Sequence, residues 1–262
     1  MLTTSYSPGT PNWLDLGSPD TDAAQAFYCA LFGWTFASAG PDAGGYGFFR
    51  QAGRTVAAIG PLTEQGASSA WTLYFQTEDA DQTAELVEQA GGTVRVGPFD
   101  VFSHGRMAGF TDPTGARFAV WQPGDTAGLD AVTSVGTLSW TELHTTDPAA
   151  AKAFYGTVFG WLTQDVPFGD FTYTVVNPAG GGTDASQGGI VGLVAEDRTA
   201  GAGSYWQPYF EVENADATIA LALQLGGTQR SPAVDEAGVG RFAQLADPHG
   251  AVFAVIKGAQ AS

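Results

Sequence analysis

The chain has 262 residues, 44% of them hydrophobic, and carries 27 acidic against 10 basic side chains, for a formal net charge of −17. The hydrophobic share supplies a core and excludes an intrinsically disordered chain. A surface of this charge repels phosphate backbones and anionic lipids, so we expect neither nucleic acid nor a membrane as a partner.

Cys29 is the only cysteine, which excludes an intrachain disulfide and a cysteine-based zinc site. It lies in an apolar helical run, where a small buried thiol is the default. The first residues show neither a basic start nor an apolar stretch of signal length, and no segment approaches 18 continuous apolar residues. We therefore expect a cytoplasmic protein.

The first half of the chain predicts a strand, a helix and three strands, and then the same order again. Residues 11–17 alternate as a strand does, and a helix follows at 21–34, with Asp20 as its cap and Gly33 as its stop. A second helix is expected at 79–92. The other expected strands lie at 34–38, 46–50, 55–60, 70–77, 93–97, 106–112 and 116–121.

The second half of the chain repeats the first. GTPNW at Gly9 corresponds to GTLSW at Gly136, an offset of 127, whereas GRMAGFTDPTGARFAV at 105–120 corresponds to GRFAQLADPHGAVFAV at 240–255, an offset of 135. We place the additional residues of the second half in the Gly-rich stretch 180–189. The repeat predicts two domains, 9–123 and 135–258, joined by a linker at 124–134.

Two motifs that occur twice in register carry a family resemblance: a helix end of the form FYxxxFGW, at Phe27 and Phe154, and a DPxG turn before the last strand, at Asp112 and Asp247. From Gly9 to Lys257 the chain resembles the vicinal-oxygen-chelate (VOC) superfamily, which contains glyoxalase I, extradiol dioxygenases and bleomycin-resistance proteins. TPNWLDL, GTLSWTEL and the GR…DPxG blocks resemble a subgroup of two-domain bacterial proteins, labelled glyoxalase-like or hydroxylase-like.

The resemblance implies an α+β fold in which four βαβββ modules form two tandem VOC domains. Each domain is expected to have a curved mixed sheet with helices on its convex side. The ligand of such a domain binds on the concave side. Single-domain relatives form dimers, so we expect a monomer or a homodimer for this two-domain chain.

The resemblance also implies where metal ligands would lie. In metal-dependent members, a His or Gln on the first strand, a His or Glu on the mid-half strand and a Glu after the DPxG turn provide nitrogen and oxygen ligands. The corresponding positions here are Trp13 and Trp140, Thr72 and Gln207, and Ala119 and Ala254. Since Trp and Ala offer no ligand atom, we predict no metal and no other cofactor.

The segment SWTELHTTD places Trp140, Glu142 and His144 at alternate positions of a strand, so their side chains share a face. Glu142 is interpreted either as a general base or acceptor for ligand hydroxyl groups, or as a structural ion pair with Arg106 or Arg241. His144 is either its proton-relay partner or an exposed residue at the rim.

The first half has Asp15 and Gly17 where the second has Glu142 and His144. Any chemistry is therefore expected in the second half. The sequence-based site consists of Glu142 and His144 as candidate catalytic residues and of Trp13, Asp15, Tyr74, Arg106, Trp121, Trp140, Gln207, Tyr209 and Arg241 as candidate ligand contacts.

Because side chains alternate between the two faces of a strand, this concave face is expected to carry aromatic rings and few charges. Such a face suits a planar or polycyclic ligand that is uncharged or cationic. Our main hypothesis is a metal-independent protein that binds a small, largely aromatic or hydrophobic molecule, in resistance, sequestration or natural-product tailoring. The alternative is an enzyme of lyase, hydroxylase or dioxygenase type that uses Glu142 and His144, with or without a non-standard metal site.

Overall fold

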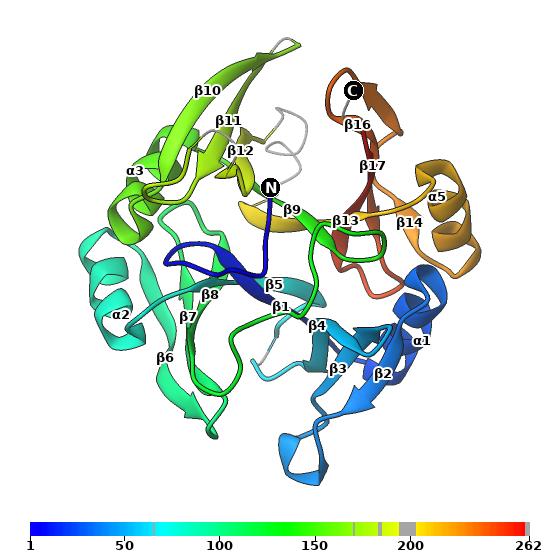
Figure 1. Cartoon of the computed structure of the whole chain (residues 1–262), viewed down its shortest axis with the longest axis horizontal. Helices are drawn as coiled ribbons and strands as arrows, with labels where there is room; N and C mark the ends of the chain where they lie inside the picture. The colour runs from blue at the N-terminus through cyan, green and yellow to red at the C-terminus, as the bar shows by residue number, and fades with distance from the viewer. Residues whose placement is uncertain (65, 170, 183–184, 194–202, 260–262) are drawn as a thin grey trace. The chain divides into compact units, whose positions relative to one another are not determined.

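The computed structural model describes residues 1–64, 66–169, 171–182, 185–193 and 203–259, and its elements repeat one order twice (Figure 1). The first half contains β1 (Pro11–Ser18), α1 (Thr21–Phe32), β2 (Thr35–Ser38), the 3₁₀ helix η1 (Pro41–Ala43), β3 (Gly47–Gln51), β4 (Arg54–Pro61), β5 (Ala70–Gln76), α2 (Ala80–Gln89), β6 (Thr93–Val101), β7 (Gly105–Thr111) and β8 (Arg117–Pro123). The second half contains β9 (Leu138–Thr145), α3 (Pro148–Phe159), β10 (Leu162–Phe168), β11 (Phe171–Asn177), β12 (Gly188–Gly192), β13 (Tyr205–Glu211), α5 (Ala215–Gln224), β14 (Thr228–Gln229), β15 (Val234–Glu236), β16 (Gly240–Ala246) and β17 (Val252–Gly258).

Each half forms a curved mixed sheet, which confirms the predicted α+β fold of βαβββ modules. The strand order is β2-β3-β4-β1-β5-β8-β7-β6 in the first half and β10-β11-β12-β9-β13-β17-β16-β14 in the second, where β15 also pairs with β16. The pairings β1–β4 and β5–β8 are parallel, whereas the hairpins are antiparallel. The crossover from β1 to β4 contains α1, and the crossover from β5 to β8 contains α2.

The helix ends follow the sequence signals. Asp20 accepts a hydrogen bond from the Ala23 amide at 2.9 Å at the start of α1, and Gly33 ends the helix with φ 70°. In α3, Asp147 and Gly160 take the same roles, with φ 66° at the glycine. A left-handed residue at this position favours glycine, which explains why both helices end in FGW.

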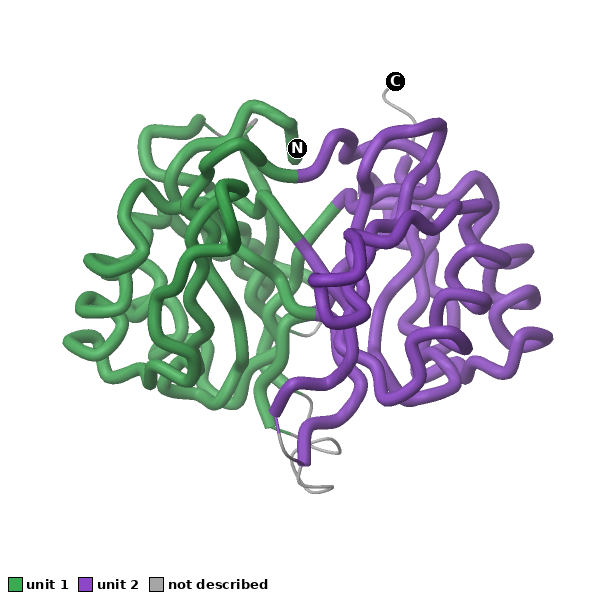
Figure 2. The backbone as a smooth tube through the Cα atoms, turned by 90° about the horizontal axis from the view of Figure 1, so that it is seen from below, with its two compact units in different colours: residues 1–13, 72–128, 140–206 green, residues 14–71, 129–139, 207–262 purple. Residues whose placement is uncertain are grey.

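The described residues form two compact units, coloured green and purple in Figure 2. Unit 1 comprises 1–13, 72–128 and 140–206, and unit 2 comprises 14–71, 129–139 and 207–262. Unit 1 combines the later module of the first half with the earlier module of the second, and its helices α2 and α3 pack against each other (Figure 1). The predicted boundaries at 9–123, 124–134 and 135–258 describe the repeat along the chain and stay a prediction.

The two repeated motifs are joined by buried hydrogen bonds inside each unit. In unit 1, the Tyr155 hydroxyl donates to Asp112 Oδ2 at 3.0 Å and accepts from Trp206 Nε1 at 2.9 Å. Asp112 Oδ1 accepts the Ala116 amide, which closes the DPxG turn. In unit 2 the equivalent residues are Tyr28, Asp247 and Trp71. The indoles of Trp71 and Trp206 are core residues.

The extra residues of the second half are divided between two places. Ile190 pairs with Leu143 just as Ile59 pairs with Leu16, so Ile190 corresponds to Ile59 at an offset of 131. Trp206 corresponds to Trp71 at an offset of 135. Half of the insertion therefore precedes β12, in the predicted stretch 180–189, of which 183–184 lie outside the described residues. The other half follows β12, and the prediction missed it; residues 194–202 of that segment also lie outside the described residues.

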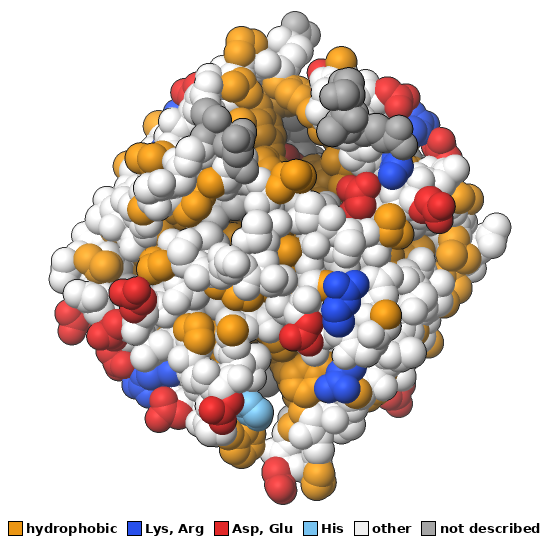
Figure 3. All heavy atoms as spheres, in the orientation of Figure 1, with side chains coloured by type: hydrophobic (Ala, Val, Ile, Leu, Met, Phe, Trp, Pro, Cys, Tyr) orange, Lys and Arg blue, Asp and Glu red, His pale blue; other side chains and the backbone are white. Residues whose placement is uncertain are grey.

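The surface is as acidic as the composition implies, with acidic side chains scattered over the face shown in Figure 3 and fewer basic ones between them. Among the described residues, no helix combines the length and the apolar character that a membrane span requires.

Candidate functional site

Glu142 is the centre of a polar cluster in unit 1. The carboxylate lies on β9 and is 7% exposed. Its Oε2 accepts a hydrogen bond from the Tyr173 hydroxyl at 2.8 Å, and its Oε1 lies 2.8 Å from Nε2 of His144. The shared face of Glu142 and His144 that alternation predicted therefore exists, and Tyr173 of β11 completes it.

Tyr173 connects Glu142 to Trp140, whose indole Nε1 donates to the tyrosine hydroxyl at 2.8 Å. Burial and the neighbouring Glu142 carboxylate raise the pKa of Tyr173 well above its usual value, so the phenol stays protonated and acts as a donor. Trp140 is partly exposed.

His144 is held from two sides. Its ring stacks on Tyr205 with centroids 4.8 Å apart and planes at 4°. The contact with Glu142 is close, but no hydrogen bond joins Nε2 to a partner among the described residues. The side chain is 12% exposed, so His144 is not an exposed rim residue, and its role as a proton-relay partner stays a prediction. We call Trp140, Glu142, His144, Tyr173 and Tyr205 the Glu142 cluster.

The first half repeats the tyrosine–carboxylate pair without the histidine. In unit 2, the Tyr46 hydroxyl donates to Asp15 Oδ2 at 2.9 Å. Gly17 occupies the position of His144. Tyr46 and Tyr173 are related by the repeat offset of 127, a signal that could have identified Tyr46 as the partner in the first half.

Trp13 and Trp121 pack against each other in unit 1. Their rings stack at 6.5 Å with an interplanar angle of 22°, and both side chains are buried. The Trp121 indole also donates to the Thr126 carbonyl at 2.8 Å. Tyr74, opposite Ala119 in the parallel β5–β8 register, is buried as well. Trp13 and Trp121 thus cover each other.

The two arginines are engaged elsewhere. Arg106 donates to Asp81 at 2.8 and 3.0 Å and to Asp100 at 2.9 Å. Arg241 donates to Asp216 and Asp235 in the same way. These aspartates raise the pKa of Arg106 and Arg241. The expected pairing of Arg106 or Arg241 with Asp15 or Glu142 is therefore wrong, and a tyrosine donates to the carboxylate in each half.

The remaining second-half candidates lie in unit 2. Tyr209 is opposite Ala254 in the β13–β17 register, and its ring lies 6.3 Å from that of Phe242. Gln207 is fully buried, and its amide has no hydrogen-bond partner among the described residues.

Two of the three implied metal positions in each half offer no ligand atom, because a Trp and an Ala stand there. The Trp140 indole donates to Tyr173, and Ala119 and Ala254 are buried methyl groups. Among the described residues, no three His, Cys, Asp or Glu side chains lie close enough to hold a metal. The chemistry of the donor set thus differs from that of a metal-dependent member.

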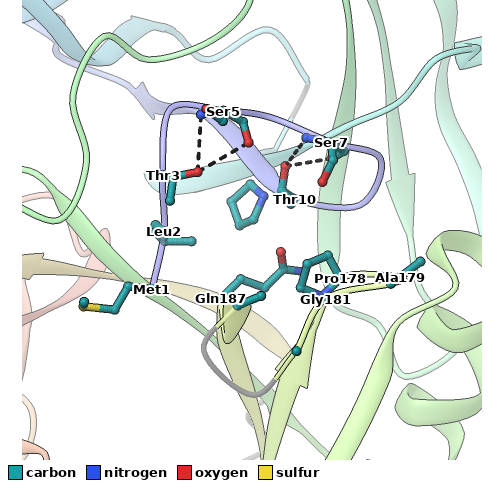
Figure 4. A pocket seen from close by; sticks show the side chains of 14 residues that line it. Met1, Leu2, Thr3, Ser5, Ser7, Thr10, Pro178, Ala179, Gly181 and Gln187 are labelled. Atoms are coloured by element: carbon teal, nitrogen blue, oxygen red, sulfur yellow. Dashed lines mark hydrogen bonds between the residues drawn. The ribbon is translucent and has the colours of Figure 1, made fainter.

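One hollow of unit 1 is lined by other residues than those of the Glu142 cluster. It measures about 630 Å³ and lies between the N-terminal residues of unit 1 and the segment between β11 and β12 (Figure 4). Met1, Leu2, Pro178 and Gln187 are among its lining residues, none of which has an acidic or basic side chain or belongs to the Glu142 cluster. The hollow therefore offers no acid–base chemistry.

Comparisons with known proteins agree with the fold and the motifs. Residues 10–120 match the model of the glyoxalase/bleomycin resistance protein/dioxygenase superfamily, and 140–256 match that of the glyoxalase-like domain. The chain belongs to this superfamily, as its repeated motifs predicted.

Curated relatives resemble the chain over nearly its whole length. The anthracycline biosynthesis protein DauV of a Streptomyces species is 39% identical over 97% of this chain and 95% of its own. The putative glyoxylase CFP32 of Mycobacterium tuberculosis is 39% identical over 96% of each chain.

Solved structures share the fold at low sequence identity. The 2,3-dioxygenase LapB from a Pseudomonas species has a TM-score of 0.64 at 12% identity, with 97% of this chain and 94% of its own covered. The Mn(II)-bound glyoxalase from Novosphingobium aromaticivorans has a TM-score of 0.60 at 18% identity, with 95% and 82% covered.

Proposed function

We propose that the protein binds a small, largely aromatic molecule at the Glu142 cluster without a metal, in resistance, sequestration or natural-product tailoring. The observation that carries this proposal is the position of Trp140 and the hydrogen bond that its indole donates. Where the family places a first-strand ligand, an indole donates to Tyr173, which in turn donates to Glu142. The cluster offers aromatic faces, a carboxylate and an imidazole, which suit hydroxyl groups on a flat ring.

The second half is the better candidate for the binding site. Trp140 is partly exposed, whereas its counterpart Trp13 is buried against Trp121. His144 adds an ionisable group that Gly17 lacks. The relative named for anthracycline biosynthesis supports a natural product as the class of ligand.

The test is to measure the metal content of the purified protein and its binding of flat phenols by calorimetry, for wild type and Glu142→Gln. We expect Glu142→Gln to weaken binding about tenfold, since it removes a charged acceptor. Asp165→Asn, a carboxylate on the α3 side of β10, serves as the matched control with unchanged affinity. A stoichiometric transition metal whose removal abolishes binding would overturn the proposal. If Asp15→Asn weakened binding about tenfold and Glu142→Gln did not, the site would lie in the first half.

A second candidate function is acid–base catalysis on the same bound molecule. The distance of 2.8 Å between Glu142 and His144 favours it, because a carboxylate next to an imidazole can orient a proton-transfer group. Binding that survives in Glu142→Gln and His144→Gln while turnover of the ligand disappears would establish an enzyme. Localisation in the cytoplasm and the monomeric or dimeric state stay predictions.

A further inference from the structure

The hairpin of β10 and β11 extends the face of the Glu142 cluster. In its register, Val166 is opposite Tyr173 and Phe168 is opposite Phe171, so these four side chains project from one face. The other face carries Asp165, which accepts hydrogen bonds from Lys152 of α3. Phe168 and Phe171 therefore point away from the helix, on the side where Tyr173 meets Glu142.

The aromatic rings on this face are continuous. Phe168 lies 5.8 Å from Tyr173 and 5.2 Å from Phe171, measured between ring centroids. Phe171 is 48% exposed, so a large apolar ring lies open to solvent beside the polar cluster. In Figure 3, hydrophobic side chains gather over the end of this hairpin.

The first half lacks this extension. Through the offset of 127, Phe168 and Phe171 correspond to Pro41 and Gly44, at the short 3₁₀ helix η1. His144 corresponds to Gly17 by the same offset. The aromatic pair and the histidine thus distinguish the second half from the first, although they lie on different strands.

We propose that Phe168 and Phe171 form an outer stacking subsite and that the ligand is a planar phenol of three or more fused rings. This proposal rests on the proposed function, because it needs a ligand at the Glu142 cluster. The hydroxyl-bearing ring meets Glu142 and His144, and the far ring stacks on the two phenylalanines. Tyr173 and Phe171 are about 6.7 Å apart along the strand, which is longer than one six-membered ring. The net charge of −17 favours a neutral ring system over an anionic one.

The experiment compares phenol, 2-naphthol and 2-hydroxyanthracene, which share one hydroxyl group and differ in ring number. Affinities are measured by quenching of tryptophan fluorescence, for wild type, Phe171→Ala and Phe168→Ala. We expect wild-type affinity to rise with ring number. Each substitution should lower affinity for 2-hydroxyanthracene about tenfold and leave phenol unchanged, because only the far ring loses its stacking partner.

Phe102→Ala is the matched control, since Phe102 is 72% exposed on the hairpin of β6 and β7. Equal affinities of Phe171→Ala and Phe102→Ala for 2-hydroxyanthracene would overturn the subsite and leave the proposed function intact. Glu142→Gln should weaken all three phenols; affinities unaffected by Glu142→Gln would instead overturn the proposed function. Binding of phenol without any gain from further rings overturns the subsite alone.

Discussion

A β-carbon added to Gly189 would lie 1.9 Å from the hydroxyl oxygen of Tyr173. Gly189 is opposite Glu142 in the parallel register of β12 and β9, so the missing side chain makes the space in which Tyr173 reaches the carboxylate. The glycine therefore positions the phenol over Glu142 without touching a ligand.

We expect Gly189→Ala to displace the Tyr173 ring and break its hydrogen bond to Glu142. The free energy of unfolding should fall by about 1–3 kcal/mol, as for overpacking in a filled interior. Urea denaturation measures the effect, and phenol affinity should fall with it. Gly97→Ala is the control, because a β-carbon there meets open space on β6. Equal stability of the two variants would contradict the role of Gly189.

The sequence predicted much of the fold because the relevant signals are local. Asp20 and Gly33 fix the ends of α1 through contacts within a few residues, and alternation places Glu142 and His144 on one face. The Tyr173–Glu142 bond depends on the register of β11, β12 and β9, which residue spacing alone does not give. The repeat offset shows that Tyr173 and Tyr46 are equivalent, but it does not show that each tyrosine contacts a carboxylate.

The burial of His144 could not be predicted from the sequence for a different reason. Strand parity indicates the face of a side chain but not what covers it, and the stacking of Tyr205 on His144 brings together residues of β13 and β9. The packing of α2 on α3 likewise depends on how modules of different halves associate. Long-range packing of this kind carries little signal in the periodicity of either segment.

The buried hydrogen bonds of Tyr155 should contribute strongly to stability. Tyr155→Phe leaves Asp112 without its tyrosine donor and the Trp206 indole without its acceptor, both in the interior of unit 1. We expect a loss of about 2 kcal/mol or more, since unpaired buried groups cost more than the net value of the bond. Thermal and urea unfolding test this, with Thr157→Ala on the exposed side of α3 as the control at nearly wild-type stability.

The left-handed conformation at the end of α1 predicts a cost for any side chain there. Gly33 has φ 70°, and a β-carbon would meet no atom within 4 Å, so backbone strain alone is tested. We expect Gly33→Ala to reduce the free energy of unfolding by about 1 kcal/mol. Gly160→Ala, at the end of α3, should have a similar or greater effect because its β-carbon would also approach Ala179 at 3.3 Å. A stabilised Gly33→Ala would show that this glycine is not needed for the helix stop.

Stability should decline at alkaline pH through three tyrosines. Burial and the adjacent carboxylates of Asp247, Asp112 and Glu142 raise the pKa of Tyr28, Tyr155 and Tyr173 well above the usual value. The unfolded chain therefore loses the protons of the three tyrosine hydroxyl groups first, at about pH 10, while the folded chain retains them. The stabilisation is complete below that pH and is lost as the pH rises towards the folded-state pKa.

Each such tyrosine lowers the free energy of unfolding by about 1.4 kcal/mol per pH unit in that window. Urea unfolding measured from pH 8 to pH 11.5 gives the slope directly. Tyr155→Phe, although less stable at neutral pH, should show a shallower alkaline decline because one titrating group is missing. A variant with the same slope as wild type would mean that Tyr155 ionises alike in the folded and unfolded states, and the raised pKa would then be wrong.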